Sequence, residues 1–259
     1  LKSVELENNT AFDKKNRPPV TVLIVNNDST AFNLYKKNEL NFLRRVPQDQ
    51  YNFATKNPKL KKEIHIQPQL RMDHLGFSGL LSNEPDLREA LLHSLDYEIL
   101  AKLLNARSRP GCVSLLASYY EGKPLCYDFD LKRAQAALEK VNPDIKNQPL
   151  NFYFSIQGGE DILRAVEWFQ NQWKKNLGLD IRLHPTENTQ LTALLKKDPP
   201  DIFRRGVPVD APSCFSAFET FQKNHPDNFL KLNNPAFIQS VDALNVPTLS
   251  QQEAARRCR

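Results

Sequence analysis

The sequence predicts an α/β fold, a sheet of largely parallel strands covered by helices, because strand and helix patterns alternate through residues 150–215. Residues 150–156 are apolar and aromatic with partial alternation, and Gly158-Gly159 ends this run. Residues 160–177 repeat apolar side chains three or four positions apart, as one face of a helix does. Gly178 follows at the position where a helix-ending glycine belongs.

Two further strands and a polar segment complete this stretch. Residues 179–183 and 201–203 predict strands, and residues 189–197 predict the short helix between them. Ligands of open α/β sheets bind outside the carboxyl ends of the strands. Residues 204–212 follow the last strand, and we expect a loop there that carries two arginines, one aspartate and two prolines.

The first part of the chain predicts a βαβ unit over residues 20–47. Its elements are a buried, β-branched strand (20–25), a helix (30–40) capped at Asp28-Ser29, and a short strand (41–43). The other predicted elements are strands over 4–6, 64–67 and 75–78, a helix over 51–60 broken by Pro58, a helical region over 87–103 divided at Asp96, and helices over 128–141, 217–221, 236–244 and 251–258.

Composition indicates a soluble, globular protein. The chain has 259 residues, of which 40% are hydrophobic and 25% charged, enough for a sizeable core. No apolar run approaches the roughly eighteen residues of a membrane helix, and no signal-peptide pattern stands at the N-terminus. The absence of methionine at Leu1 suggests an upstream segment that was removed or left out. The net charge of +5 is spread along the chain, so nucleic-acid binding is not expected.

Catalytic and metal-binding patterns are missing from the sequence. The five histidines are scattered without a spacing such as HExxH, and neither GxSxG nor a phosphate-binding glycine loop occurs. Ser213-Cys214 offers a thiol, but no nearby histidine would serve as its base. We therefore expect no enzyme activity, no cofactor and no metal.

The four cysteines leave disulfide pairing open. Cys112 and Cys126 flank one loop and could bridge it, whereas Cys214 and Cys258 could pair or remain reduced. Connectivity depends on geometry that the sequence does not show.

Four segments, in chain order, carry a resemblance to a known family. They are residues 31–42 (AFNLYKKNELNF), Leu75-Gly76-Phe77-Ser78 with residues 86–91 (DLREAL) and 95–99 (LDYEI), residues 127–134 (YDFDLKRA), and residues 173–178 (WKKNLG), which a strand and residues 204–215 follow. Over most of residues 5–256 the chain resembles the peptide-binding family of periplasmic solute-binding proteins that serve ABC importers.

The resemblance implies periplasmic-binding-protein-like lobes, each a mixed sheet with flanking helices. Residues 1–78 resemble part of the first lobe and the crossover, and residues 79–259 resemble the second lobe without its C-terminal return to the first. Family members are considerably longer, so the chain resembles a fragment.

The resemblance also implies a ligand site. The family often has Gly-Trp, then an aspartate three residues after the tryptophan that holds the peptide's α-ammonium, then an aromatic residue. Gly206 and Asp210 match this pattern, whereas Val207 and Ala211 replace the aromatic residues. The charge anchor is kept and the aromatic walls are lost.

Three further residues are candidates for ligand contact. Arg204 could hold a ligand carboxylate or pair with Asp210. Phe77 and Ser78 lie near the expected hinge, where backbone groups could bind an extended peptide as an added strand. For Asp210 itself, the plainer explanation is a turn aspartate beside proline.

The expected function is a non-enzymatic, monomeric component of an ABC import system, periplasmic or attached to the cell envelope. It would hold a short peptide or another small molecule between two lobes and present the closed form to a membrane permease. The alternative is the ligand-sensing domain of a transcription regulator with the same fold. A DNA-binding segment upstream would decide for the regulator, and a signal or lipoprotein sequence would decide for transport.

Overall fold

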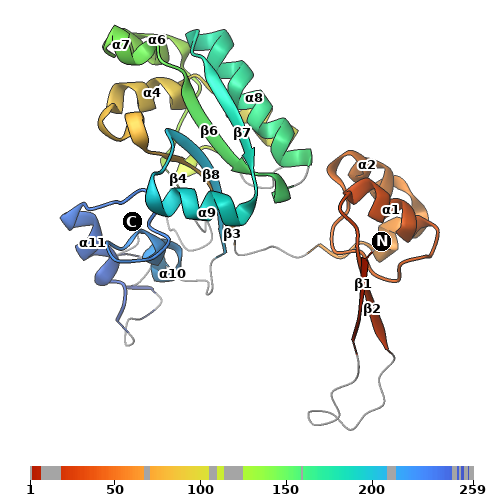
Figure 1. Ribbon diagram of the computed structural model, residues 1–259. Coiled ribbons are helices and arrows are strands. Elements are labelled where there is room, and N and C mark those ends of the chain that lie inside the picture. The colour runs from red at the N-terminus through yellow and green to blue at the C-terminus, as the bar shows by residue number, and fades with distance from the viewer. Residues whose placement is uncertain are drawn as a thin grey trace. The chain divides into compact units, whose positions relative to one another are not determined.

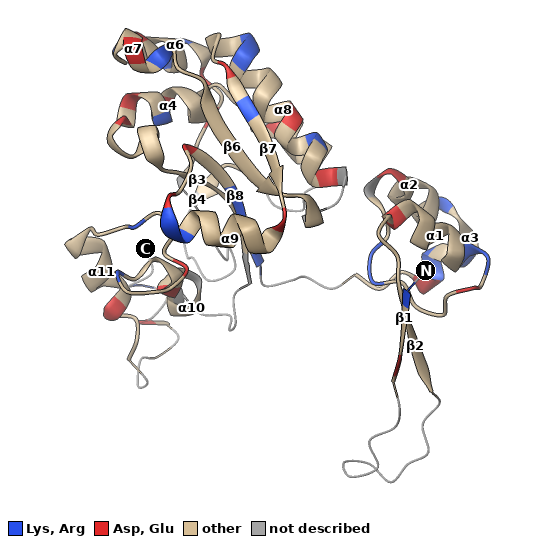
Figure 2. Cartoon of the chain, in the orientation of Figure 1, with Lys and Arg blue, Asp and Glu red and all other residues tan. Residues whose placement is uncertain are grey.

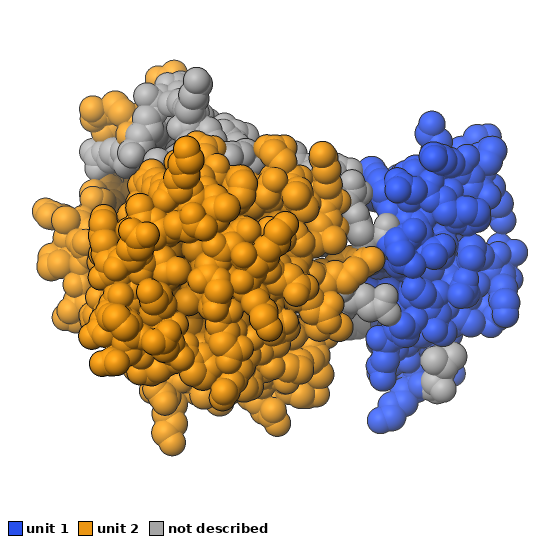
Figure 3. Space-filling model, turned by 90° about the horizontal axis from the view of Figure 1, so that it is seen from above, with its two compact units in different colours: residues 1–66 blue, residues 67–259 orange. Residues whose placement is uncertain are grey.

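A computed structural model describes residues 2–6, 19–66, 71–104, 110–113, 125–158, 160–208, 214–246, 250, 252–253 and 256 (Figure 1). The chain divides into two compact units, unit 1 (Leu1–Ile66) and unit 2 (Gln67–Arg259) (Figure 3). The assignment of residues 1–78 and 79–259 to two lobes of a family member stays a prediction. The helix expected over residues 251–258 lies largely outside the described residues.

Unit 1 combines a two-stranded ribbon with three helices. Strands β1 (Lys2–Leu6) and β2 (Val20–Ile24) pair antiparallel. Helices α1 (Asp28–Lys36), α2 (Gln48–Lys56) and α3 (Pro58–Glu63) bury a small apolar cluster, which consists of Phe32, Ala54 and Leu60. The predicted break at Pro58 is confirmed, because the Asn57 side chain caps α3 and Pro58 opens it.

Three predictions for unit 1 are wrong. The strand over residues 20–25 was expected to be buried, yet Val20, Val22 and Ile24 are about half exposed because β1 is the only described strand beside β2. Residues 41–43 and 64–66 form no strand, so no βαβ unit arises. The cap of α1 is Asn27, whose Oδ1 accepts the Thr30 N–H at 2.8 Å, one residue before the predicted cap.

Unit 2 is built on a four-stranded mixed sheet in the order β3-β8-β6-β7. Its strands are β3 (Arg71–Phe77), β8 (Ile202–Pro208), β6 (Leu150–Ser155) and β7 (Ile181–Thr186). β6 is parallel to β7 and β8, whereas β3 runs antiparallel to β8. The predicted α/β class with a mixed sheet and flanking helices is confirmed.

Helices cover both faces of this sheet (Figure 1). Helices α4 (Pro85–His93), α6 (Leu131–Glu139) and α8 (Glu160–Leu177) share one large apolar core with Phe152 of β6. On the other face, Leu191 and Leu195 of α9 (Asn188–Lys197) pack with Phe203 of β8. The consecutive residues Ile202 and Phe203 of β8 therefore belong to different cores, because successive side chains of a strand point to opposite faces of the sheet.

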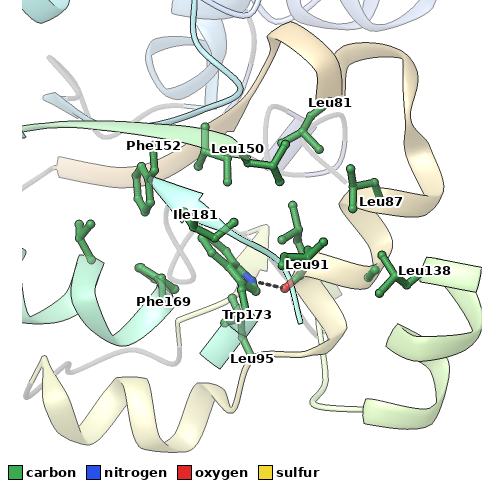
Figure 4. Close-up of a cluster of buried hydrophobic side chains, with 14 of the residues drawn as sticks. Leu81, Leu87, Leu91, Leu95, Leu138, Leu150, Phe152, Phe169, Trp173 and Ile181 are labelled. Atoms are coloured by element: carbon green, nitrogen blue, oxygen red, sulfur yellow. Dashed lines mark hydrogen bonds between the residues drawn. The ribbon is translucent and has the colours of Figure 1, made fainter. Parts of the chain in front are cut away.

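Trp173 of α8 lies at the centre of the larger core (Figure 4). Its side chain is completely buried, and its ring stacks on that of Phe169 with 5.5 Å between centroids. Its indole N–H donates a hydrogen bond of 2.9 Å to the Leu91 carbonyl of α4. Trp173 therefore belongs to the apolar helix face that the spacing in residues 160–177 predicted. Gly178 ends α8 with a φ of 71°, as its position predicted.

The remaining elements of unit 2 connect these layers. Asp96 divides the helical region as predicted, since its Oδ1 accepts the backbone N–H groups of Glu98 and Ile99 at the start of α5. Cys112 and Cys126 face each other on two short strands and form a disulfide. The other elements are η1 (Gly79–Asn83), α5 (Tyr97–Leu103), β4 (Cys112–Val113), β5 (Leu125–Cys126), α7 (Pro143–Lys146), η3 (Ile156–Gly158), α10 (Cys214–Phe218), η4 (Glu219–Phe221) and α11 (Pro235–Asp242). Within the described ranges, no helix has the length and apolar character to cross a membrane.

Candidate ligand-binding site on strands β3 and β8

The segment Arg204–Pro208, predicted as a loop, continues strand β8. Its residues pair antiparallel with β3, with Gly206 opposite Asp73 and Arg204 opposite Leu75. Gly206 and Pro208 suggested a loop, but both residues pair with β3, a strand far away in the sequence, and so belong to the sheet. The ligand segment that was predicted to follow Phe203 therefore begins as the end of strand β8.

One edge of this strand end has no described strand beside it. β6 runs parallel to β8 with Tyr153 beside Phe203, so Phe154 and Ser155 of β6 fall beside Arg204 and Arg205. Only residues 206–208 extend beyond β6, while β3 occupies their other side. A free strand edge presents backbone N–H and C=O groups that an extended peptide can pair with. The sheet therefore offers a backbone template at the segment that the sequence pattern singled out.

Charged side chains of β3 and β8 meet beside this template, where Figure 2 shows basic residues on β8. Arg204 Nη2 lies 2.9 Å from Asp73 Oδ1, and the Arg204 side chain is only 12% exposed. Burial lowers the pKa of Arg204, while the Asp73 carboxylate opposes that shift. Arginine keeps its proton in such an environment. Arg204 thus has an ion pair with Asp73, a partner that the sequence did not suggest, and its predicted partner Asp210 lies outside the described residues.

Arg71 approaches the same carboxylate oxygen from the neighbouring position on β3. Its Nε and Nη2 atoms both lie 3.2 Å from Asp73 Oδ1. A Cβ atom at Gly206 would overlap the Arg71 guanidinium and the Asp73 carboxylate. The lack of a side chain at Gly206 therefore allows these two charged groups to lie over β8.

The opposite face of the same strands carries His74 and Arg205. The His74 ring contacts Phe203 and Phe221 edge to face, with centroids 6.2 and 6.1 Å apart, and among the described residues its buried Nδ1 has no hydrogen-bond partner. Burial lowers the pKa of His74 to about 4, reinforced by Arg204 and Arg205 and opposed by Asp73. Arg205 donates to Asn188 Oδ1 at 2.8 Å. His74 is thus a neutral imidazole at neutral pH.

Replacing His74 by phenylalanine should weaken the pH dependence of stability between pH 6.5 and 4. Because the folded pKa of about 4 lies below the ordinary 6.5, the unfolded chain binds the extra proton first as pH falls. The contribution of His74 to the free energy of unfolding is fully present above pH 6.5, and it falls by up to about 3 kcal/mol as the pH drops to 4. Melting temperatures across this range measure the effect. His65→Phe, at an exposed position, is the control and should follow the unmodified protein.

The structure separates Phe77 and Ser78 from the other candidates. They lie at the end of β3 beside the start of β8, where Phe77 is opposite Ile202, whereas Gly206 and Val207 lie toward the far end of β8. Ser78 is buried, its N–H donates to the Asp201 carbonyl at 2.9 Å, and its hydroxyl donates to the Pro200 carbonyl. These contacts give Ser78 a structural role. Val207 is described through its backbone only.

Phe77 lines a cavity of about 420 Å³ next to α4 and α6. Arg88 and Glu89 of α4 and Arg133 of α6 share that lining. Arg88 donates to the carbonyls of Leu81 and Ser82, and Arg133 Nε lies 2.6 Å from Glu89 Oε1. The charged residues of this cavity therefore connect helical segments to one another, which gives Arg88 a structural role.

Sequence reasoning missed Arg71, Asp73 and His74. The only sequence signal was an alternation of polar and apolar residues before Leu75, in a segment expected to form a strand only from Leu75 onward. Their common location depends on the β3–β8 pairing. Within the part of the chain that the structure describes, no group of three or more His, Cys, Asp or Glu side chains could hold a metal ion.

Open α/β sheets bind their ligands outside the carboxyl ends of the strands, and residues 206–208 lie at that end of β8. Residues 2–229 match the model of the bacterial extracellular solute-binding proteins, family 5. The chain belongs to this family.

Similar proteins agree with this assignment. The oligopeptide-binding protein OppA of Bacillus subtilis (strain 168) is 25% identical over 260 residues, which cover 91% of this chain and 46% of OppA. The chain thus spans about half the length of such relatives. The Escherichia coli murein tripeptide binding protein MppA shares the fold, with a TM-score of 0.78 at 18% identity over 93% of this chain and 48% of MppA. NikA from Staphylococcus aureus, solved in complex with Ni(L-His)2, also has a TM-score of 0.78, at 14% identity over 99% of this chain and 56% of NikA.

Proposed function

We propose that this chain is part of the solute-binding component of an ABC import system and binds a short peptide. The observation that carries this proposal is the open edge of β8 at residues 206–208, which lies within the ligand segment of the sequence pattern. A peptide lying along this edge would form main-chain hydrogen bonds that do not depend on its side chains. Oligopeptide binding by a relative of the same family supports the peptide as ligand class.

Charge recognition would add to these backbone contacts. Asp210 stands four residues beyond Gly206 and would accept hydrogen bonds from the ammonium group of a peptide. With valine and alanine at positions 207 and 211, recognition relies on backbone and charge more than on aromatic walls. The protein acts as a monomeric carrier that a membrane permease recognises, outside the cytoplasmic membrane or attached to the envelope, and catalyses no reaction. Nothing in the comparisons supports the transcription-regulator alternative.

The same fold serves different ligands, because MppA, a murein tripeptide binding protein, and NikA, solved in complex with Ni(L-His)2, have equal TM-scores to this chain. A direct binding test is therefore needed. Replacing Asp210 by alanine should weaken binding of tripeptides with a free N-terminus at least tenfold, since a charge-assisted hydrogen bond contributes about 1.5–3 kcal/mol. Isothermal titration calorimetry measures this loss.

The control for Asp210→Ala is Asp198→Ala, which removes an exposed carboxylate at the end of α9. This variant should bind like the unmodified protein. N-acetylated peptides should bind both variants equally. Unchanged affinity of Asp210→Ala for free peptides would remove Asp210 from the site.

A further inference from the structure

We propose that Arg71, with Arg204 behind it, forms a carboxylate-binding subsite beside Gly206 and makes the chain select peptides that carry a carboxylate there. This inference rests on the proposed peptide-binding function. It concerns the unbalanced charge at the end of β8 and the position of the Arg71 guanidinium.

Positive charge exceeds negative charge around the strand end. Arg71 and Arg204 share a single carboxylate, that of Asp73, and both use the same oxygen, Oδ1. On the other face, burial lowers the pKa of Arg205, Asp227 opposes that shift and Arg71 adds to it. On the face that Arg71 and Arg204 share, two guanidiniums therefore stand against the one carboxylate of Asp73. The surplus favours an anionic ligand group in the space that these side chains surround.

The two arginines of the pair differ in how much they need Asp73. Arg204 is 12% exposed and lies at 2.9 Å, so its desolvated charge depends on this ion pair. Arg71 is 45% exposed and its contacts are longer, at 3.2 Å. Among the described residues, Asp73 is the only hydrogen-bonding partner of Arg71. Arg71 is thus the guanidinium whose N–H donors are available to a ligand. Arg204, paired with Asp73, stays behind it as a second positive charge.

Gly206 brings this guanidinium to the predicted ligand strand. Any side chain at position 206 would occupy the space of the Arg71 head group, which lies over the β8 backbone. The backbone of the same residue belongs to the segment whose second edge has no described strand partner. A peptide on that edge would place one of its groups next to Arg71. Guanidinium and carboxylate are complementary in shape and charge, often with two parallel hydrogen bonds.

The test compares the full chain with Arg71→Met, which keeps the length of the side chain and removes its charge. Arg182→Met is the matched control, because Arg182 is an exposed strand arginine on β7 beside Asp180. Four peptides with free N-termini are titrated by calorimetry: Ala-Ala-Ala, Ala-Ala-Ala amide, Ala-Glu-Ala amide and Ala-Gln-Ala amide. The first has a terminal carboxylate, the third a side-chain carboxylate, and the other two have neither.

We expect the unmodified chain and Arg182→Met to bind at least one carboxylate peptide about tenfold more tightly than its neutral counterpart. Arg71→Met should lose this preference while its affinity for the neutral peptides stays unchanged. Whichever acidic peptide shows the preference identifies a terminal or a side-chain carboxylate as the ligand group.

Two results overturn the inference alone: equal affinity of the unmodified chain for all four peptides, or equal losses for acidic and neutral peptides in Arg71→Met. The second would show that Arg71 only supports the structure. Absence of binding by any of the four peptides would instead contradict the proposed function, and the inference with it.

Discussion

Trp173→Ala is expected to lower the free energy of unfolding of unit 2 by about 3–5 kcal/mol. The side chain is completely buried in the core that β6, α4 and α8 share, where it contacts Phe152 and Phe169. Its removal leaves a cavity that the surrounding helices fill only in part, and it deletes the hydrogen bond to the Leu91 carbonyl. Urea denaturation followed by circular dichroism measures the loss.

Trp168→Ala is the matched control, since Trp168 lies on the same helix and is only partly buried. It should cost about 1 kcal/mol, because less apolar area returns to water. Similar losses for the two variants would contradict the central position of Trp173 in the core.

Asp201→Ala should lower the free energy of unfolding by about 3 kcal/mol or more, because buried donors left without partners cost about 1–3 kcal/mol each. The Asp201 side chain is buried at the start of β8 and accepts hydrogen bonds from the backbone N–H of Leu80 at 3.1 Å and of Asn151 at 2.9 Å. The Asn151 side-chain amide donates a third bond at 3.3 Å. These bonds connect the turn after β3, strand β6 and strand β8.

The control for Asp201 is Asp198→Ala, three residues earlier and exposed at the end of α9. It should change the free energy of unfolding, measured by urea denaturation, by less than about 0.5 kcal/mol, as surface substitutions usually do. A stable Asp201→Ala variant would show that water or neighbouring groups satisfy the three donors.

Local sequence signals predicted much of unit 2. The periodic apolar face of α8, its terminal Gly178 and the division at Asp96 each depend on residues within one or two helical turns. Such features need no knowledge of distant partners. Unit 1 was predicted less well, because the apolar pattern of β2 indicates a strand but does not show whether anything covers it.

The candidate site could be predicted only in part. The family pattern directed attention to Arg204, Gly206 and Val207, and the structure places all three on β8. The antiparallel pairing of β3 with β8 joins residues that are far apart in the chain, and no local pattern indicates that Asp73 lies opposite Gly206. For the same reason the sequence did not suggest Arg71 as a neighbour of Arg204.

The central claim, that the chain binds short peptides, is tested most directly by a thermal-shift screen of the full-length protein against di- to pentapeptides with N-acetylated controls. A ligand present at a hundred times its dissociation constant stabilises the folded state by about 2.7 kcal/mol. We predict that peptides with a free N-terminus raise the melting temperature and that their acetylated counterparts do so much less. No change with any peptide would contradict the claim.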